Sequence, residues 1–336
     1  MSHALILQTL RRFAVVVITL LVNLWGTDGQ FSQAADSSAS PKISYYHWAN
    51  TYTNQPTLIQ TYQPAHLYLK LLDIGYQHPR LVIHPTRIET PPTVPVIPVV
   101  FVDNAAMQDD QLETLYQQIH THIPPNRYQS LQVDCDWTEQ TRETYFSLLQ
   151  RLQTDYSDLS VTLRLHQIKY AKRTGVPPAK RALLMYYNMS EIRDPETDNY
   201  ILDNAVGKTY LYNFAEYPLP LDLALPLYQQ TRIIRDSKLV HLAAGITPTP
   251  NKTELLAANH YRVTQGHYWQ DYYLYPEDEL RLDTVDMPLL QQATQLLASL
   301  MQPNEIIFYT LNDADRFDAA DLNAIANTFT SRSQTP

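Results

Sequence analysis

The stretch LQVDCDWTEQTRETYFSLLQRLQT, residues 131–154, contains the clearest change of pattern in this chain. It opens with apolar residues that alternate with polar ones, as in a strand, and continues with apolar residues every three or four positions, as in a helix. We therefore predict a strand over Leu131–Trp137 and a helix over Thr138–Thr154, with the Thr138 hydroxyl as its N-cap. A strand followed by a helix is the repeating unit of a parallel sheet.

The same unit recurs along the chain. The other seven short apolar or β-branched runs are Ile43–Trp48, His66–Asp73, Val96–Asp103, Val161–His166, Ala182–Asn188, Leu221–Tyr228 and Ile306–Asn312. Helical periodicity lies between most of them, most clearly over Asp109–His122, Pro288–Met301 and Ala319–Phe329. Eight such units in 336 residues predict an α/β fold, a single (β/α)8 TIM barrel over residues 42–330. The aromatic-rich segment around 239–283 breaks the alternation, and we predict an insertion there, before the last strand.

Residues 1–34 have the pattern of a signal peptide. Arg11 and Arg12 precede an apolar run over residues 13–25, and a polar stretch with small residues ends at Ala34. This order predicts cleavage after Ala34, and residues 35–41 then form a flexible lead-in. If the segment stayed attached, residues 13–25 would anchor the protein to a membrane. Either way we expect an exported protein, periplasmic or extracellular.

The composition excludes several classes of partner. The formal charge is −9 and Lys and Arg form no run, so we expect no nucleic acid. Only 7 Gly are present, with no glycine-rich phosphate-binding string, so we expect no nucleotide cofactor. The single Cys135 rules out a Cys-based zinc cluster, and the histidines lack a zinc spacing such as HExxH, so we expect no metal. The 24 Tyr and 4 Trp supply rings that stack on sugars.

The fourth predicted strand carries the strongest catalytic candidates, because barrel active sites lie at the carboxyl ends of the strands. Alternation places Gln132, Asp134 and Asp136 on one face of this strand. Two carboxylates so close raise the pKa of one, which leaves a proton-holding acid beside an ionised partner. We predict that Asp136 is the general acid/base and that Asp134 sets its pKa. The alternative is that both aspartates are structural.

The remaining candidates are polar or aromatic residues near the ends of the predicted strands. We predict that they bind substrate: Trp48, Asp73, Trp137, Arg164, His166, Gln167, Tyr187, Asn188 and Asp313. Arg164 and His166 could instead only neutralise the aspartate pair, and each aromatic residue could belong to the core. A second carboxylate could act beside the general acid as nucleophile, base or stabiliser, and Asp134, Asp73, Asp103 and Asp313 are candidates for it.

Two strings resemble a known family. DCDW at Asp134–Trp137 resembles the D-x-D-W signature of chitinase-type glycoside hydrolases, and MYYN at Met185–Asn188 is similar to their M-x-Y-D string. The resemblance implies a (β/α)8 barrel that acts on a glycan. The catalytic Glu of that family follows the second Asp by two residues, where this chain has Thr138, and Glu139 lies one residue later.

Further strings resemble a group of uncharacterised, exported bacterial barrel proteins that are themselves similar to glycoside hydrolases. These strings occupy residues 133–146, 163–167, 174–178 and 184–189. We therefore expect an exported glycoside hydrolase-like protein that acts on a poly- or oligosaccharide. The alternative is a non-catalytic carbohydrate-binding barrel that has lost the catalytic Glu. A DxD glycosyltransferase is disfavoured, because nucleotide sugars are not normally available outside the cytoplasm.

Overall fold

The computed structural model of the chain describes residues 40–212, 214–245, 247–269 and 271–330. The predicted signal peptide over residues 1–34, with its apolar run 13–25, lies outside these residues, as does the lead-in before residue 40. No helix in the described part of the chain is long and apolar enough to cross a membrane.

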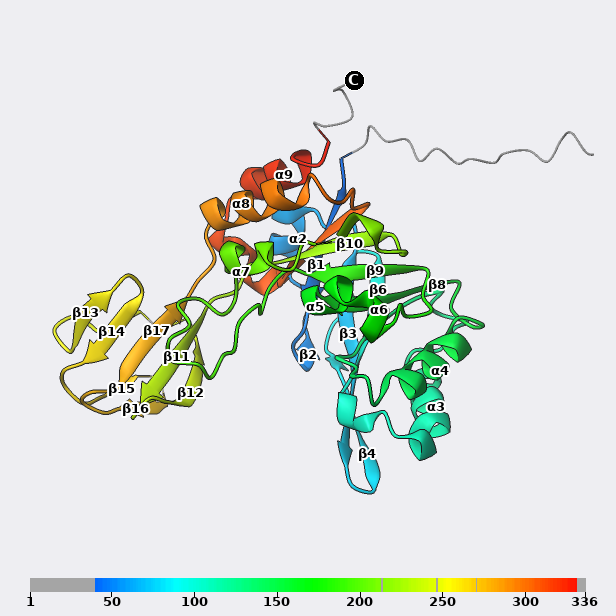
Figure 1. The fold of residues 1–336 in the computed structure, drawn as a ribbon, viewed down its shortest axis with the longest axis horizontal. Coiled ribbons are helices and arrows are strands. Elements are labelled where there is room, and N and C mark those ends of the chain that lie inside the picture. Colours follow the sequence, from blue (N-terminus) through cyan, green and yellow to red (C-terminus); the bar gives the residue numbers. More distant parts are fainter. Residues whose placement is uncertain (1–39, 213, 246, 270, 331–336) are drawn as a thin grey trace, which may run out of the picture. The chain divides into compact units, whose positions relative to one another are not determined.

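Eight parallel strands close into a barrel (Figure 1). β1 (Lys42–His47) pairs with β18 (Glu305–Tyr309) on one side and with β3 (Leu67–Gln77) on the other, so the sheet has no gap. The predicted (β/α)8 barrel is therefore confirmed. In barrel order the strands are β1 (Lys42–His47), β3 (Leu67–Gln77), β6 (Val96–Val102), β7 (Ser130–Asp134), β8 (Asp158–Arg164), β9 (Arg181–Met185), β10 (Leu221–Pro226) and β18 (Glu305–Tyr309).

Helices follow most of the strands, and α3 and α4 lie side by side outside the barrel (Figure 1). The four clearest predicted helices correspond to α3, α4, α8 and α9, but α4 begins at Arg142 rather than Thr138. Thr138 does not cap it, because residues 138–141 form a turn in which the Thr138 N–H donates to the Thr141 hydroxyl. The α-helices are α2 (Pro56–Tyr62), α3 (Leu112–His122), α4 (Arg142–Leu152), α5 (Leu165–Lys169), α6 (Ala171–Thr174), α7 (Asn204–Lys208), α8 (Met287–Leu297) and α9 (Ala319–Asn327), and the 3-10 turns are η1 (Asn104–Ala106), η2 (Asp109–Gln111), η3 (Phe214–Glu216) and η4 (Leu311–Arg316).

The second crossover departs from the β/α rule. Between β3 and β6 the chain forms no helix. Instead, the chain turns back after β3, and β4 (Arg80–Pro85) pairs antiparallel with β3 to form a hairpin that points away from the barrel. The short strands β2 (Thr51–Tyr52) and β5 (Arg87–Ile88) then pair with each other. The sheet thus has nine strands, of which eight form the closed barrel.

A second sheet is inserted between β10 and β18. It begins at Gln230, earlier than the predicted start at residue 239, and has its own small apolar core around Ile233 and Leu280. Five antiparallel strands make up this sheet, in the order β12 (Lys238–Ala244), β11 (Gln230–Arg235), β17 (Glu279–Asp283), β14 (His260–Val263) and β13 (Thr253–Ala257), and β15 (His267–Trp269) pairs with β16 (Tyr272–Leu274).

A fully buried ion pair joins the inserted sheet to a barrel loop. Arg232 on β11 and Asp283 on β17 are both 0% exposed, with Arg232 Nε 2.8 Å from Asp283 Oδ2. The remaining guanidinium N–H groups donate to the carbonyls of Asp194 and Thr197 in the loop after β9. The N–H of Tyr200 in that loop donates to Asp283 at 3.1 Å. A buried ion pair is tolerated when its remaining hydrogen-bonding groups are satisfied in this way.

The two faces of the barrel strands bury different kinds of side chain. The outer face packs against the helices and forms the large core, for example Val133, Val161 and Leu184. The inner face carries a smaller cluster that contains Tyr46 and Tyr187. Polar residues also point inward, because they occupy the alternate positions of the same strands.

Glu305 is the centre of a buried polar network at the amino end of the barrel. It accepts hydrogen bonds from Ser44 and, at 2.9 Å, from Tyr68, and its Oε1 lies 2.7 Å from His66 Nδ1. Burial alone would raise the pKa of Glu305, but the hydrogen bonds, that of His66 foremost, outweigh it and lower the pKa below its ordinary value. The ionised carboxylate therefore stabilises this end of the barrel.

We predict that Glu305→Gln lowers the free energy of unfolding at neutral pH by about 1–3 kcal/mol, because an amide cannot accept all of these hydrogen bonds. A carboxyl whose pKa is lowered by folding stabilises the protein above its unfolded-state pKa, and this stabilisation is lost as the pH falls through the lowered value. Urea unfolding at a series of pH values should therefore show the two proteins converging in acid. The control is Glu143→Gln, on an exposed side chain. A constant gap at all pH values would contradict this role of Glu305.

Candidate functional site

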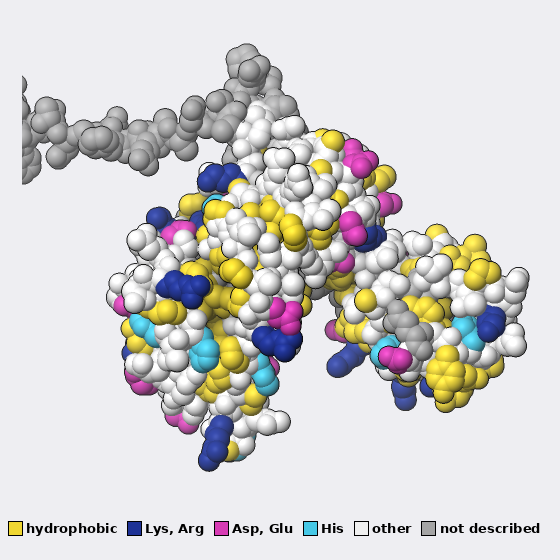
Figure 2. Space-filling view, turned by 180° about the vertical axis from the view of Figure 1, so that it is seen from behind, with side chains coloured by type: hydrophobic (Ala, Val, Ile, Leu, Met, Phe, Trp, Pro, Cys, Tyr) yellow, Lys and Arg dark blue, Asp and Glu magenta, His cyan; other side chains and the backbone are white. Residues whose placement is uncertain are grey.

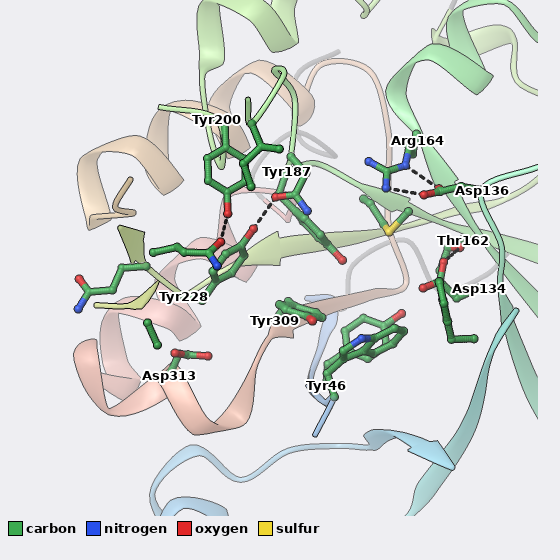
Figure 3. A pocket seen from close by; sticks show the side chains of 18 residues that line it. Tyr46, Asp134, Asp136, Thr162, Arg164, Tyr187, Tyr200, Tyr228, Tyr309 and Asp313 are labelled. Atoms are coloured by element: carbon green, nitrogen blue, oxygen red, sulfur yellow. Dashed lines mark hydrogen bonds and ion pairs between the residues drawn. The ribbon is translucent and has the colours of Figure 1, made fainter. Parts of the chain in front are cut away.

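A cavity of about 570 Å³ opens at the carboxyl ends of the barrel strands (Figure 3). Its lining comes from seven barrel strands or the loops after them, and from the first strands of the inserted sheet. The residues that line it are Tyr46, Trp48, Phe101, Asp134, Asp136, Thr162, Arg164, Met185, Tyr187, Asn188, Ile192, Tyr200, Tyr228, Gln229, Gln230, Ala244, Tyr309 and Asp313.

Asp134 is the last residue of β7 and is buried, with 8% of its surface exposed. One carboxylate oxygen accepts a hydrogen bond of 2.5 Å from the Thr162 hydroxyl on the neighbouring strand β8. Burial raises the pKa of Asp134 to about 6, and the charge of Asp136 adds to this, while the Thr162 hydrogen bond acts in the opposite direction. Near neutral pH this carboxyl can therefore both hold and release a proton.

Asp136 is more exposed and is held by Arg164. Arg164 Nε donates to Asp136 Oδ1 at 2.6 Å and Nη2 donates to Oδ2 at 2.5 Å, the two-pronged geometry that a planar guanidinium favours. These hydrogen bonds raise the pKa of Arg164 above its already high value. The prediction was that Asp136 holds the proton and Asp134 tunes it. The structure instead raises the pKa of Asp134, because the deeper carboxyl is the more desolvated one.

Aromatic rings form one side of the cavity. The Tyr309 ring has its centroid 5.5 Å from that of Tyr187, 5.7 Å from those of Tyr46 and Tyr228, and 5.8 Å from that of Trp48. Tilted and edge-on contacts of this kind are the favourable geometries for aromatic pairs, so the rings hold each other in place. They present apolar faces beside the carboxylates.

Two tyrosine hydroxyls form hydrogen bonds that join neighbouring segments of the cavity wall. The Tyr228 hydroxyl donates to the side-chain oxygen of Asn188, and the Tyr200 hydroxyl donates to Gln230 at the start of the inserted sheet. Asn188 has φ of 54°, in the left-handed region, where Asn is better tolerated than most residues. The turn after β9 thereby directs the Asn188 side chain toward Tyr228.

The structure brings seven of the eleven predicted site residues to the cavity. Five of them follow directly from the strand ends: Asp134, Asp136, Arg164, Tyr187 and Asn188. Trp48 and Asp313 also line it, from β1 and from η4 after β18.

Four predicted residues do not line this cavity. Trp137 lies after the end of β7 and packs between the barrel and α4, stacked on Tyr145 at 5.1 Å. β8 ends at Arg164 and α5 begins at Leu165, so His166 and Gln167 lie on a helix; Gln167 accepts a hydrogen bond from the backbone N–H of Arg164. The alternation that placed His166 beside Arg164 was therefore wrong.

Two further candidate carboxylates are also engaged elsewhere. Asp73, the fourth predicted residue outside the lining, pairs with the buried Lys70 at 2.6 Å. Asp103 caps η1 by accepting from the N–H of Ala105. Glu139, the nearest glutamate to the position where chitinase-type enzymes have theirs, pairs with Arg173 at 2.8 Å and does not line the cavity.

The sequence interpretation missed several lining residues. Thr162 shares a strand face with Arg164, and Tyr309 is the last residue of β18, so strand alternation was the available signal for both. Tyr200 and Gln230 could not be found in this way, because they come from a loop and from the inserted sheet.

The described residues form no evident metal cluster, and one face of the molecule has no continuous basic patch. Among the described residues, no group of three or more His, Cys, Asp and Glu side chains could hold a metal ion. On the face shown in Figure 2, Lys and Arg side chains lie at separate points rather than in a continuous patch.

Comparison with solved structures shows the same fold in glycoside hydrolases, at very low sequence identity. A chitinase from Chromobacterium violaceum is 11% identical with a TM-score of 0.54, and the match covers 88% of this chain and 100% of that chain. The spore cortex-lytic enzyme SleL from Bacillus megaterium is 12% identical with a TM-score of 0.53, over 86% of this chain and 74% of that one. A chitinase from Bacillus thuringiensis is 11% identical with a TM-score of 0.54, over 87% of this chain and 70% of that one.

No protein-family model and no curated protein matches this sequence. The similarity is therefore a distant one that shows a glycoside hydrolase-like fold.

We predict that Thr162→Val raises the pKa of Asp134 further above its value of about 6, because the lost hydrogen bond favours the ionised carboxylate. The measurement is a carboxyl carbon NMR titration. Ser160→Ala is the matched control, since Ser160 lies on the same strand and its buried hydroxyl has no partner among the described residues. An unchanged Asp134 titration in Thr162→Val would show that the hydrogen bond does not tune this group.

Proposed function

We propose that this protein is an exported glycoside hydrolase whose proton donor is Asp134. The observation that carries the proposal is a buried carboxyl with a pKa near 6, facing a cavity lined by aromatic rings. Sugar rings stack on aromatic faces, and their hydroxyls pair with polar groups such as Asn188 and Tyr187. The cavity lies at the carboxyl ends of the barrel strands, the position of the active site in barrel enzymes, and this supports the proposal.

The proposed reaction uses Asp134 first as acid and then as base. Its proton moves to the glycosidic oxygen while the bond from that oxygen to the anomeric carbon breaks, and positive charge develops on the sugar ring. A water oxygen then bonds to the anomeric carbon and its proton returns to Asp134. Asp136 is the second carboxylate and stabilises the developing charge, and Arg164 fixes its position through two hydrogen bonds.

A second candidate function is carbohydrate binding without catalysis. Two observations favour it: Thr138 stands where chitinase-type enzymes have their catalytic Glu, and Arg164 occupies both oxygens of Asp136. In that case the rings would hold the glycan, and Asp134 would be a hydrogen-bonding group only.

Export is part of the proposal. It rests on the signal-peptide pattern of residues 1–34, and it agrees with a hydrolytic or binding activity that needs no nucleotide cofactor.

We predict that residues 35–336 release sugar from at least one member of a broad glycan panel, and that Asp134→Asn lowers the rate about 100-fold or more, the scale of a lost general acid. Because the acid must be protonated, kcat/KM should fall as the pH rises through about 6. Glu139→Gln is the control, since Glu139 lies in a surface ion pair and should leave the rate unchanged.

The same panel separates the two functions. Retention on an immobilised glycan without release, equal in wild type and Asp134→Asn, would identify a binding protein. Equal release by both proteins would remove Asp134 from the reaction.

A further inference from the structure

Acidic side chains outnumber basic ones in the lining of the cavity. Three carboxylates line it, Asp134, Asp136 and Asp313, against one cation, Arg164. That cation is already committed to Asp136 by two short hydrogen bonds. No Lys or His is among the described residues that line the cavity. The cavity therefore attracts cations and repels anions.

Asp313 has no cation in contact with it among the described residues. It lies in η4, just after β18, and its Oδ2 accepts a hydrogen bond of 2.6 Å from the Thr310 hydroxyl. The nearby Arg316 directs its guanidinium to the backbone carbonyls of Leu227 and Val285 instead. Asp313 thus has a free acceptor oxygen and forms no ion pair, while the charge of the nearby Arg316 offsets part of its own.

Tyr309 lies between this carboxylate and Asp134. Burial raises the pKa of the Tyr309 hydroxyl, and the charges of Asp134 and Asp313 raise it further, so both carboxylates act on the same ring. The faces of Tyr309 and its neighbour Tyr228 carry the negative part of the ring quadrupole. The Trp48 ring already has the Lys70 ammonium over it, 5.3 Å from the ring centroid. A positive group beside Tyr309 would be stabilised by the ring and by both carboxylates.

A polar group on the opposite wall also lacks a partner. Tyr187 is 9% exposed, and its hydroxyl has no hydrogen-bond partner within the described residues. Figure 3 shows this hydroxyl directed into the same space as Tyr309 and Asp134. The Tyr187 hydroxyl therefore reaches the open space of the cavity, where it can donate a hydrogen bond to a polar group of a bound ligand or accept one from it.

These features narrow the ligand to an organic cation with a polar ring. A metal ion does not fit, because no three metal-ligating side chains converge among the described residues. A uronic acid would be repelled by Asp134 and Asp313. A neutral sugar would stack on the rings but would form no ion pair with Asp313.

We propose that the sugar bound in this cavity carries a free ammonium group, as in a 2-amino-2-deoxyhexose, and that Asp313 together with the Tyr309 ring recognises that group. This inference rests on the proposed function only in that the cavity binds a glycan; it does not require hydrolysis. Asp313 is then the residue that selects amino sugars over neutral and N-acetylated ones.

The test is calorimetric binding to oligosaccharides of equal length at about pH 6, where most amines of glucosamine and galactosamine oligomers are protonated. The probes are oligomers of glucosamine, galactosamine, N-acetylglucosamine and glucose, with spermidine as a cation that lacks a sugar ring. We expect at least one amino-sugar oligomer to bind about 10-fold more tightly than the N-acetylated and neutral oligomers, and spermidine to bind more weakly than that amino sugar. The two amino sugars differ only in ring stereochemistry, so their comparison identifies the hexose.

Asp313→Asn should remove this preference while it keeps the weaker binding of neutral oligomers. Asp315→Asn is the matched control, because Asp315 is an exposed aspartate of the same turn that does not line the cavity. If Asp315→Asn removed the preference equally, the preference would depend on the net negative charge of this turn. The assignment of amine recognition to Asp313 would then be overturned.

The other outcomes are equally distinct. Neutral or N-acetylated oligomers that bind as tightly as the amino sugars would overturn the inference and leave the proposed function in place. If spermidine bound as tightly as the amino sugar, the claim that the ligand is a sugar would be overturned. Binding of no oligosaccharide at all would overturn the proposed function and this inference with it.

Discussion

The pairing of β1 with both β18 and β3 is the constraint on which the rest of the structure depends. Once the parallel sheet is closed, each strand has an inner and an outer face, and the period of two decides which residues occupy each. The outer positions are almost all apolar and pack on the helices. The side chains at the inner positions fill the interior of the barrel, whose width is fixed. Here they are tyrosines and polar side chains that form hydrogen bonds with one another.

This polar interior changes from one end of the barrel to the other. At the amino end, Glu305 is surrounded by donors, and the resulting hydrogen bonds keep it ionised although it is buried. At the carboxyl end, Asp134 has a single hydroxyl donor, and burial dominates its titration. Two buried carboxyls on one barrel thus have pKa values displaced in opposite directions. The difference lies in the groups around each carboxyl: His66, Ser44 and Tyr68 bond to Glu305, whereas Asp134 bonds to Thr162 and has the like charge of Asp136 beside it.

Periodicity alone was sufficient to predict the barrel, since eight strand runs separated by helical stretches admit few other arrangements. It also directed attention to the ends of the strands, where Asp134, Arg164 and Tyr187 indeed meet. It failed where a strand ended earlier than the pattern suggested: Trp137 and His166 continue an apparent alternation after the backbone has already turned. The pKa of Asp134 could not be predicted either, because depth below the rim depends on side chains from other strands. Lining residues from the inserted sheet, such as Gln230, could not be predicted, because no pattern in the neighbouring sequence marks them as part of the cavity.

The Arg232–Asp283 pair means that the inserted sheet is not an independent module. Its guanidinium satisfies two carbonyls of the loop after β9, and its carboxylate holds the backbone N–H of Tyr200, so excising residues 230–283 would leave these loop groups without their partners. The loop and the sheet should therefore open together, with matching amide hydrogen-exchange rates, as one cooperative unit that includes one wall of the cavity. Shortening or grafting the insertion in protein engineering would alter the site itself, whereas the β3–β4 hairpin, which contributes no residue to the cavity lining, offers a position for such changes.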